Sequence, residues 1–179
     1  MKKSWLAACL GALLSLVGCD AQRISELEEG LSTEADVRAR FGEPIAVWDA
    51  QDMASLPGAG AAAQPGARTL EYTRQPNGHV NYLITIGPDG KMSLLRQTLS
   101  ESNFQRVAPG MRMEDVRKML GKPMKVTTYA LKQETHYDWR YLSDPTTSKI
   151  FTAVFDPELR VVRTGYTDDI RPASDGSQR

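Results

Sequence analysis

Cysteine and histidine are scarce in this sequence of 179 residues, which contains two of each. Cys9 and Cys19 both lie near the start, so a chain cleaved before Cys19 keeps one thiol and forms no internal disulfide. His79 and His136 have no second histidine at metal-ligand spacing. A Gly-rich phosphate loop, a Gly-x-Ser-x-Gly elbow and a His-Glu-x-x-His motif are also missing. We therefore expect no metal, no other cofactor and no enzymatic activity.

An excess of charge of one sign is missing too, since 22 Lys and Arg residues balance 22 Asp and Glu residues. Binding to nucleic acid needs a clustered basic face, so we expect no nucleic-acid partner. The apolar run near the N-terminus, Trp5 to Val17, is shorter than the roughly 20 residues that a membrane-spanning helix needs.

The N-terminus is typical of a bacterial export signal. Lys2 and Lys3 precede the apolar run, whose length suits a signal-peptide core of roughly 7–15 residues. The run ends in Leu16-Val17-Gly18-Cys19, which resembles the lipobox of bacterial lipoproteins. We predict a signal peptide at residues 1–18 and lipid attachment at Cys19, with the protein facing the periplasm and bound to membrane lipid through its acyl chains. The alternative is an ordinary signal peptide that happens to end near a cysteine.

The rest of the chain contains an internal duplication. Residues 36–44 (DVRARFGEP) and 115–123 (DVRKMLGKP) are identical at five positions, at an offset of 79 residues. Downstream, residues 82–90 parallel residues 151–159. Matching segments in the same order indicate two copies of one structural unit.

Each copy predicts short helices followed by strands. Thr33 is placed to cap a helix that ends at Gly42, and the second copy has a helix that ends at Gly121. Shorter helices are expected at residues 24–29 and 101–107. Alternating β-rich segments predict strands at 70–74, 80–86, 92–98, 124–131, 135–141, 149–155 and 161–166. The predicted fold class is α+β: two tandem repeats, each with short helices followed by an antiparallel β-meander, the helices packed on one sheet face.

These patterns divide the chain into segments. The first repeat is expected at residues 19–100, with a flexible insertion at 51–68, where Ala, Gly and Pro dominate. The second repeat is expected at 101–170. Residues 171–179 are rich in polar and small residues and are expected to form a disordered tail.

The second repeat resembles the BamE (SmpA/OmlA) family of lipoproteins. The resemblance lies in Val107 to Met111, in Leu120-Gly121-Lys122-Pro123, and in Tyr137 to Tyr141. It implies a small lipoprotein of the machine that assembles outer-membrane β-barrel proteins, in contact with other components and with lipid. The tandem arrangement is similar to the β-lactamase-inhibitor-protein fold, which binds a protein partner on its sheet surface.

Two functions therefore remain open. One is a non-enzymatic scaffold or assembly factor for outer-membrane β-barrel proteins; the other is a module that binds or inhibits another envelope protein. A carrier of lipid or small ligands would need an apolar cavity between sheet and helices. The family favours the outer membrane, whereas Asp20, directly after Cys19, favours the inner membrane in enteric bacteria.

Three residues are candidates for partner contact, because Trp and Arg often anchor protein interfaces. Trp48 lies beside the expected insertion, and Trp139 and Arg140 lie in a predicted strand. Packing in the core is the alternative for the aromatic residues of the strands.

Overall fold

The computed structural model describes residues 20–170. The predicted signal peptide at 1–18, the predicted lipid attachment at Cys19 and the predicted tail at 171–179 lie outside the described residues. The first half contains α1 (Asp20–Ser25), α2 (Glu34–Phe41), β1 (Ala46–Asp49), α3 (Ala50–Ala54), η1 (Gly60–Ala63), β2 (Arg68–Thr73), β3 (Asn81–Ile86) and β4 (Met92–Gln97). The second half contains α4 (Glu101–Phe104), α5 (Met113–Leu120), β5 (Lys125–Tyr129), η2 (Ala130–Lys132), β6 (Glu134–Leu142), β7 (Ser148–Phe155) and β8 (Val161–Asp168).

The strands form two antiparallel sheets of four strands each. Sheet 1 has the order β1-β2-β3-β4, and sheet 2 has the order β5-β6-β7-β8. Helices combined with two such sheets confirm the predicted α+β class and its two repeated units. All seven predicted strands are present, whereas β1, a strand of four residues, was not predicted.

The two halves repeat the same contact between helix and sheet. The Tyr72 hydroxyl, in β2, donates to the carbonyl of Gly42 at 3.1 Å, just after α2. The Trp139 indole, in β6, donates to the carbonyl of Gly121 at 2.9 Å, just after α5. In both copies, an aromatic strand residue therefore holds the end of the helix that precedes the sheet.

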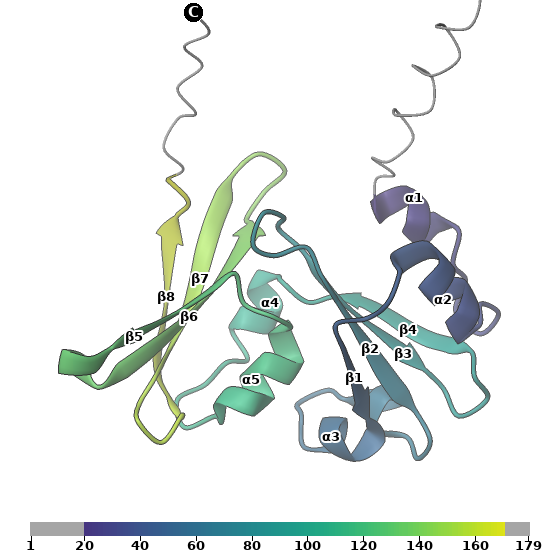
Figure 1. Cartoon of the computed structure of the whole chain (residues 1–179), viewed down its shortest axis with the longest axis horizontal. Helices are drawn as coiled ribbons and strands as arrows, with labels where there is room; N and C mark the ends of the chain where they lie inside the picture. The colour runs from purple at the N-terminus through teal and green to yellow at the C-terminus, as the bar shows by residue number, and fades with distance from the viewer. Residues whose placement is uncertain (1–19, 171–179) are drawn as a thin grey trace, which may run out of the picture.

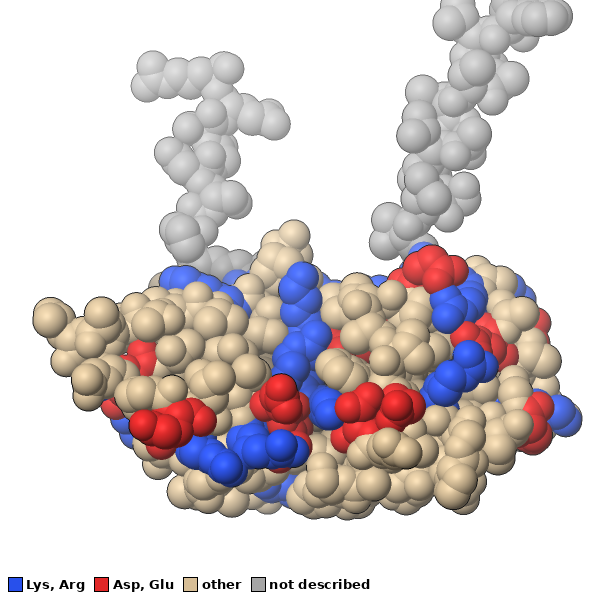
Figure 2. All heavy atoms as spheres, turned by 60° about the horizontal axis from the view of Figure 1, so that its bottom comes forward, with Lys and Arg blue, Asp and Glu red and all other residues tan. Residues whose placement is uncertain are grey.

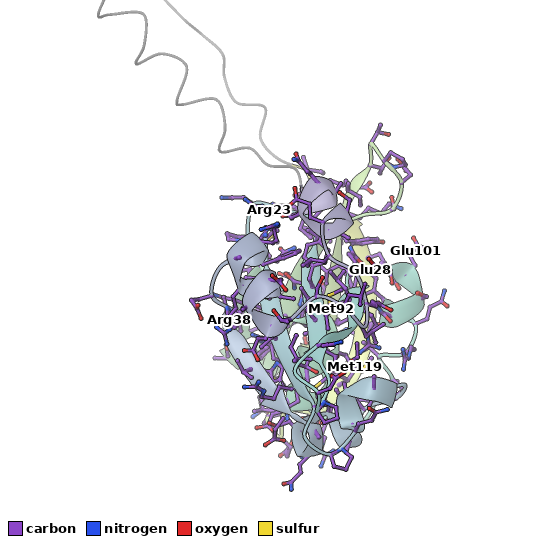
Figure 3. All side chains as sticks on the ribbon, turned by 90° about the vertical axis from the view of Figure 1, so that its right-hand side faces the viewer. Arg23, Glu28, Arg38, Met92, Glu101 and Met119 are labelled. Carbon is purple, nitrogen blue, oxygen red and sulfur yellow. The ribbon has the colours of Figure 1, made fainter. Side chains whose placement is uncertain are left out.

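The molecule is layered, as Figure 1 shows: α1 and α2 cover one face of sheet 1, and α5 lies between the two sheets. No helix of residues 20–170 lies on the far face of sheet 2. The core beneath α2 is made of buried apolar side chains, namely Val37, Phe41, Leu70, Tyr72, Tyr82, Ile84, Ile86 and Met92. Figure 3 looks onto α1 and α2 and marks Met92, which belongs to this core. Thr33 caps α2 in a reciprocal capping box with Asp36, as predicted for the cap.

The second core lies between sheet 2 and its own helices. It contains Leu99, Phe104, Val107, Val116, Leu120, Trp139, Tyr141, Phe151, Ala153, Phe155 and Val161. The rings of Phe104 and Phe151 stack with their centroids 4.2 Å apart. The aromatic residues at odd positions of β6 thus face the helices, as the alternation of a strand requires.

Residues 51–68 are folded, which corrects the prediction of a flexible insertion there. Asp49 starts α3 through a capping box with Asp52. The segment then buries Met53, Leu56, Ala59 and Ala62 in a third cluster with Leu83 of sheet 1. These apolar side chains pack against the second face of sheet 1, so the segment rich in Ala and Gly has a buried apolar side.

Two short helices differ from their predicted positions. The first was expected at 24–29, but α1 spans Asp20–Ser25. Its first residue, Asp20, accepts hydrogen bonds from the Arg74 guanidinium at 2.9 and 3.0 Å, and this long-range contact is not visible in a local pattern. The helix expected at 101–107 is α4, which ends at Phe104.

Candidate protein-binding site between the two halves

The end of α5 is held by the second face of sheet 1. The Leu120 carbonyl accepts hydrogen bonds from Asn81 Nδ2 at 2.9 Å and from Thr98 Oγ1 at 2.8 Å. Asn81 Nδ2 also donates to the carbonyl of Lys122 at 2.9 Å. The last carbonyls of a helix have no partner within the helix, so these side chains cap α5 from the other half of the molecule.

A buried carboxylate completes this junction. Glu71 of β2 has no exposed surface, and it accepts hydrogen bonds from Arg117 Nη1 at 2.7 Å and from the Lys122 backbone N–H at 2.8 Å. The Trp48 indole donates to it at 3.3 Å. A buried charge is tolerated only when it is paired and hydrogen-bonded, and Glu71 satisfies this condition with groups from both halves.

Gly121 permits the close approach of α5 and sheet 1. Its φ is +80°, in the left-handed region that disfavours residues with a Cβ. A Cβ at this position would also lie 2.9 Å from Asn81 Nδ2 and 3.1 Å from Asn81 Cβ. The glycine that the sequence marks as a helix end is therefore also required at the interface between the halves.

A second ion pair joins α5 to the segment that follows β1. Lys118 Nζ donates to Asp52 Oδ1 at 2.8 Å and lies 5.3 Å from the centroid of the Trp48 ring. The hydrogen bond from Lys118 lowers the pKa of the Asp52 carboxyl below its ordinary value. Trp48 is thus enclosed between Glu71 and Lys118, two side chains that fix α5 to the first half.

An open groove of about 670 Å³ runs beside this junction. Its lining combines apolar and basic side chains from both halves: Ile45, Met113, Arg117, Lys122, Pro123, Met124, Lys125, Val126 and Tyr137. Ile45 and Val126 are each 48% exposed. Figure 2 shows a column of Lys and Arg side chains in the middle of the face it presents, with Asp and Glu side chains beside its lower end. Exposed apolar surface rimmed by charge is typical of a binding site for another protein.

The structure does not bring the three predicted contact residues together. Trp48 is half-buried at the junction, near the groove. Arg140 lies elsewhere: its guanidinium contacts Asp169 at 2.8 Å and also donates to the carbonyl of Pro76. Arg140 therefore ties the β2–β3 loop to the end of β8 instead of presenting a free cation.

The interpretation of Trp139 as a partner contact is corrected by its position. Its side chain is 0% exposed and packs in the core of the second half. The indole N–H is used by the carbonyl of Gly121. With its ring covered and its donor satisfied, Trp139 is a structural residue, as the alternative of core packing stated.

Sequence reasoning missed the residues that build the junction and the groove. Glu71, Asn81 and the two lysines at 122 and 125 were not singled out. No sequence signal marks Glu71, because an acid between Leu70 and Tyr72 fits the alternation of a strand with one face in solvent. Its partner Arg117 is 46 residues away, so the sequence offers no local clue to the pairing.

A separate charge cluster lies on the far face of sheet 2. Glu134 accepts hydrogen bonds from Arg163 Nη1 at 2.5 Å and Nη2 at 2.8 Å, and it contacts His136 Nε2 at 3.1 Å. The hydrogen bonds from Arg163 and then from His136 lower the pKa of the Glu134 carboxyl from 4.5 to about 2. Because the folded pKa is the lower one, this carboxylate stabilises the fold above pH 4.5 and the contribution is lost as the pH falls toward 2.

We predict that Glu134→Gln removes part of the acid sensitivity of the protein. Urea unfolding measured at intervals from pH 6 to pH 2 should show a smaller loss of stability for the variant than for the wild type in the window between 4.5 and 2. Glu158→Gln, at an exposed turn position, is the matched control and should leave the profile unchanged. Identical profiles for wild type and Glu134→Gln would contradict the prediction.

Within residues 20–170, no group of three or more His, Cys, Asp or Glu side chains is arranged to hold a metal ion. No helix in this same part of the chain has the length and apolar character needed to cross a membrane.

No protein-family model matches the chain, and no curated protein matches it. Among solved structures, the chain is similar to a DUF4309 family protein (YjgB) from Bacillus subtilis subsp. subtilis str. 168, with 20% identity and a TM-score of 0.29. The match covers 82% of this chain and 85% of that chain.

Proposed function

We propose that this protein is a lipid-anchored, non-enzymatic scaffold that faces the periplasm and supports the assembly of outer-membrane β-barrel proteins. The observation that carries the proposal is the groove between the halves, which exposes apolar and basic side chains on a rigid support. The junction holds the Arg117 side chain and the backbone of Lys122 in place, and preorganisation of this kind favours affinity.

Rigidity of the support follows from the contacts around α5. One side of the helix packs in the second core through Val116 and Leu120. Its other side reaches the first half through Arg117 and Lys118, which pair with Glu71 and Asp52. The first half contributes Ile45 to the groove and the second half contributes the other lining residues, so a partner in the groove contacts a surface that depends on both.

The sequence before α1 supports membrane attachment. Residues 16–19 resemble a lipobox, and α1 begins at Asp20, the next residue after Cys19. The Asp20 carboxylate contacts both Arg74 and Arg23, at 2.9 and 3.4 Å. Acyl chains on Cys19 would hold this end of the folded body at the lipid surface without a spacer. In Figure 1, α1 and the end of β8 lie along the same side of the molecule, the upper one in this view, which would then face the membrane.

The link to β-barrel assembly is supported by the resemblance of the second half to the BamE family. In the structure, Gly121 and Trp139 are residues of the helix–sheet contact, and Gly121 also contacts the first half. Residues that carry the resemblance therefore build the fold and the junction beside the groove.

Partner capture from native membranes tests the proposal. The full-length chain with a C-terminal tag is expected to co-purify with β-barrel assembly components from solubilised membranes, and deletion of its gene is expected to lower porin levels. Cys19→Ser should move the protein out of the membrane fraction. Absence of assembly components together with normal porin levels would contradict the assembly role, and capture of a cell-wall hydrolase would favour the inhibitory module instead.

A further inference from the structure

We propose that the groove binds an extended, acid-containing segment of a partner chain, which adds as a strand to the free edge of β5. This inference rests on the proposed function, which places the partner in the groove. It specifies the chemistry of the partner, which the proposed function leaves undefined.

Strand addition is possible because β5 is an edge strand. Within the described residues β5 pairs only with β6, so its other edge has no strand beside it. Lys125 and Val126 of this strand line the groove. Unpaired backbone groups along an edge are a template for another extended chain, and several peptide-binding domains use such an edge.

The groove also selects the side chains of the incoming strand. Successive side chains of an extended segment point to opposite faces, so every second one can enter the groove. There they would meet Ile45 and Val126, both about half exposed, together with Met113 and Met124. Apolar side chains at alternate positions of the partner therefore fit this lining.

The lysines of the groove favour a partner segment that contains acidic residues. Among the described residues, the ammonium groups of Lys122 and Lys125 form no ion pair, whereas Arg117 is paired with Glu71. Asp138 lies opposite Lys125 in the register of the sheet, but its carboxylate accepts the Thr152 hydroxyl at 2.6 Å. Carboxylates in the polar positions of the partner would compensate the two free lysines.

The same lysines argue against a second copy of this chain as the occupant. Pairing of β5 with β5 of another copy would bring two sets of Lys122 and Lys125 together, and lysines at a sheet edge oppose such contacts in natural proteins. An acidic segment gains from the charges that disfavour self-association. The occupant is therefore a different chain with alternating acidic and apolar residues.

A defined peptide probe tests this inference. The probe is a fluorescent peptide of alternating Glu and Val with blocked ends, added to the full-length protein in a neutral detergent. We expect its anisotropy to rise on binding and amide hydrogen exchange to slow in residues 125–129, with exchange in β8, another edge strand, unchanged. A peptide with Lys in place of Glu should bind about tenfold more weakly or not at all.

Charge-reversal variants distinguish binding in the groove from non-specific electrostatic attraction. Lys125→Glu and Lys122→Glu should each weaken binding of the acidic peptide about tenfold. Lys91→Glu makes the same charge change in a turn of the first half and should leave binding unchanged. Thermal unfolding of all variants checks that each is folded, which is expected because Lys122 and Lys125 are exposed.

Each other outcome overturns the inference in a defined way. Equal binding of the Lys peptide would refute the role of charge, and binding without slowed exchange at 125–129 would refute strand addition. No binding of the peptide, with binding to phosphatidylglycerol vesicles that Lys125→Glu abolishes, would show a lipid-binding face instead. If the peptide binds but no assembly components co-purify, the assembly role is refuted and the peptide-binding groove is supported. If assembly components co-purify but the peptide does not bind, only the peptide-binding groove is refuted.

Discussion

The Glu71→Ala variant is expected to lose about 3 kcal/mol of unfolding free energy. The substitution leaves the Arg117 guanidinium, which is only 21% exposed, and the Lys122 N–H without their buried acceptor. It also frees the indole N–H of Trp48. Removing one partner of a buried pair costs more than the pair contributes when intact, because the remaining charge stays poorly solvated. Urea denaturation followed by far-ultraviolet circular dichroism measures the loss.

Two variants sharpen this prediction. Glu71→Gln keeps an oxygen that can accept the Lys122 N–H, so its loss should be smaller than that of the alanine variant. Asp138→Ala is the matched control, because Asp138 precedes Trp139 in sheet 2 as Glu71 precedes Tyr72 in sheet 1. Asp138 is only half-buried, and its carboxylate contacts the Thr152 hydroxyl. Its loss should be about 1 kcal/mol or less. Equal losses for Glu71→Ala and Asp138→Ala would contradict the special role of the junction.

Cooperativity between the halves provides a second measure of the same contact. Trp48 reports on the junction and Trp139 on the second core, so variants of the chain from residue 19 onward that keep one of these two indoles follow each region separately by fluorescence. With Glu71 present, both signals should change at one urea concentration. Weakening the junction in Glu71→Ala should separate them, because each half has its own sheet and its own core.

Much of the fold could be predicted because its determinants are local. Thr33 and Asp36 form the capping box within one helical turn, and Gly42 and Gly121 end their helices with φ near +80°. The strands are rich in β-branched and aromatic residues, and the same order of elements recurs in the second copy. These features depend on neighbours within a few residues, so the sequence displays them directly.

The junction and the groove depend on contacts that the sequence does not display. Asn81 and Thr98 cap a helix that ends 39 and 22 residues further along the chain. β1 is too short to show a clear alternation, and the alanines after it were misread as mobile because their burial depends on the sheet beneath. A duplicated sequence also does not tell how one copy packs on the other. Here α5 serves both sheets, and that arrangement creates the groove.

Trp139 shows why an aromatic residue in a strand is ambiguous at the level of sequence. Alternation places it on the same face of β6 as Tyr137 and Tyr141, but the pattern does not say whether that face meets solvent or helices. In the structure the face meets α5, and the centroid of the Trp139 ring lies 6.1 Å from that of Phe151. Exposure of the face, rather than the residue type, decides between an interface anchor and a core residue.

Trp139→Ala is therefore expected to destabilise the protein by about 3–5 kcal/mol, as large-to-small changes of buried aromatic residues do. Trp139→Phe keeps a ring but loses the hydrogen bond to the Gly121 carbonyl, so its loss should be smaller, about 1–3 kcal/mol. Leu131→Ala, at a fully exposed position on the β5–β6 hairpin, should change stability by less than about 0.5 kcal/mol. Because Trp139 does not line the groove, folded Trp139→Phe should bind the acidic peptide as the wild type does. If Trp139→Phe instead left stability unchanged and weakened peptide binding, Trp139 would be a partner-contact residue, which would contradict its place in the core.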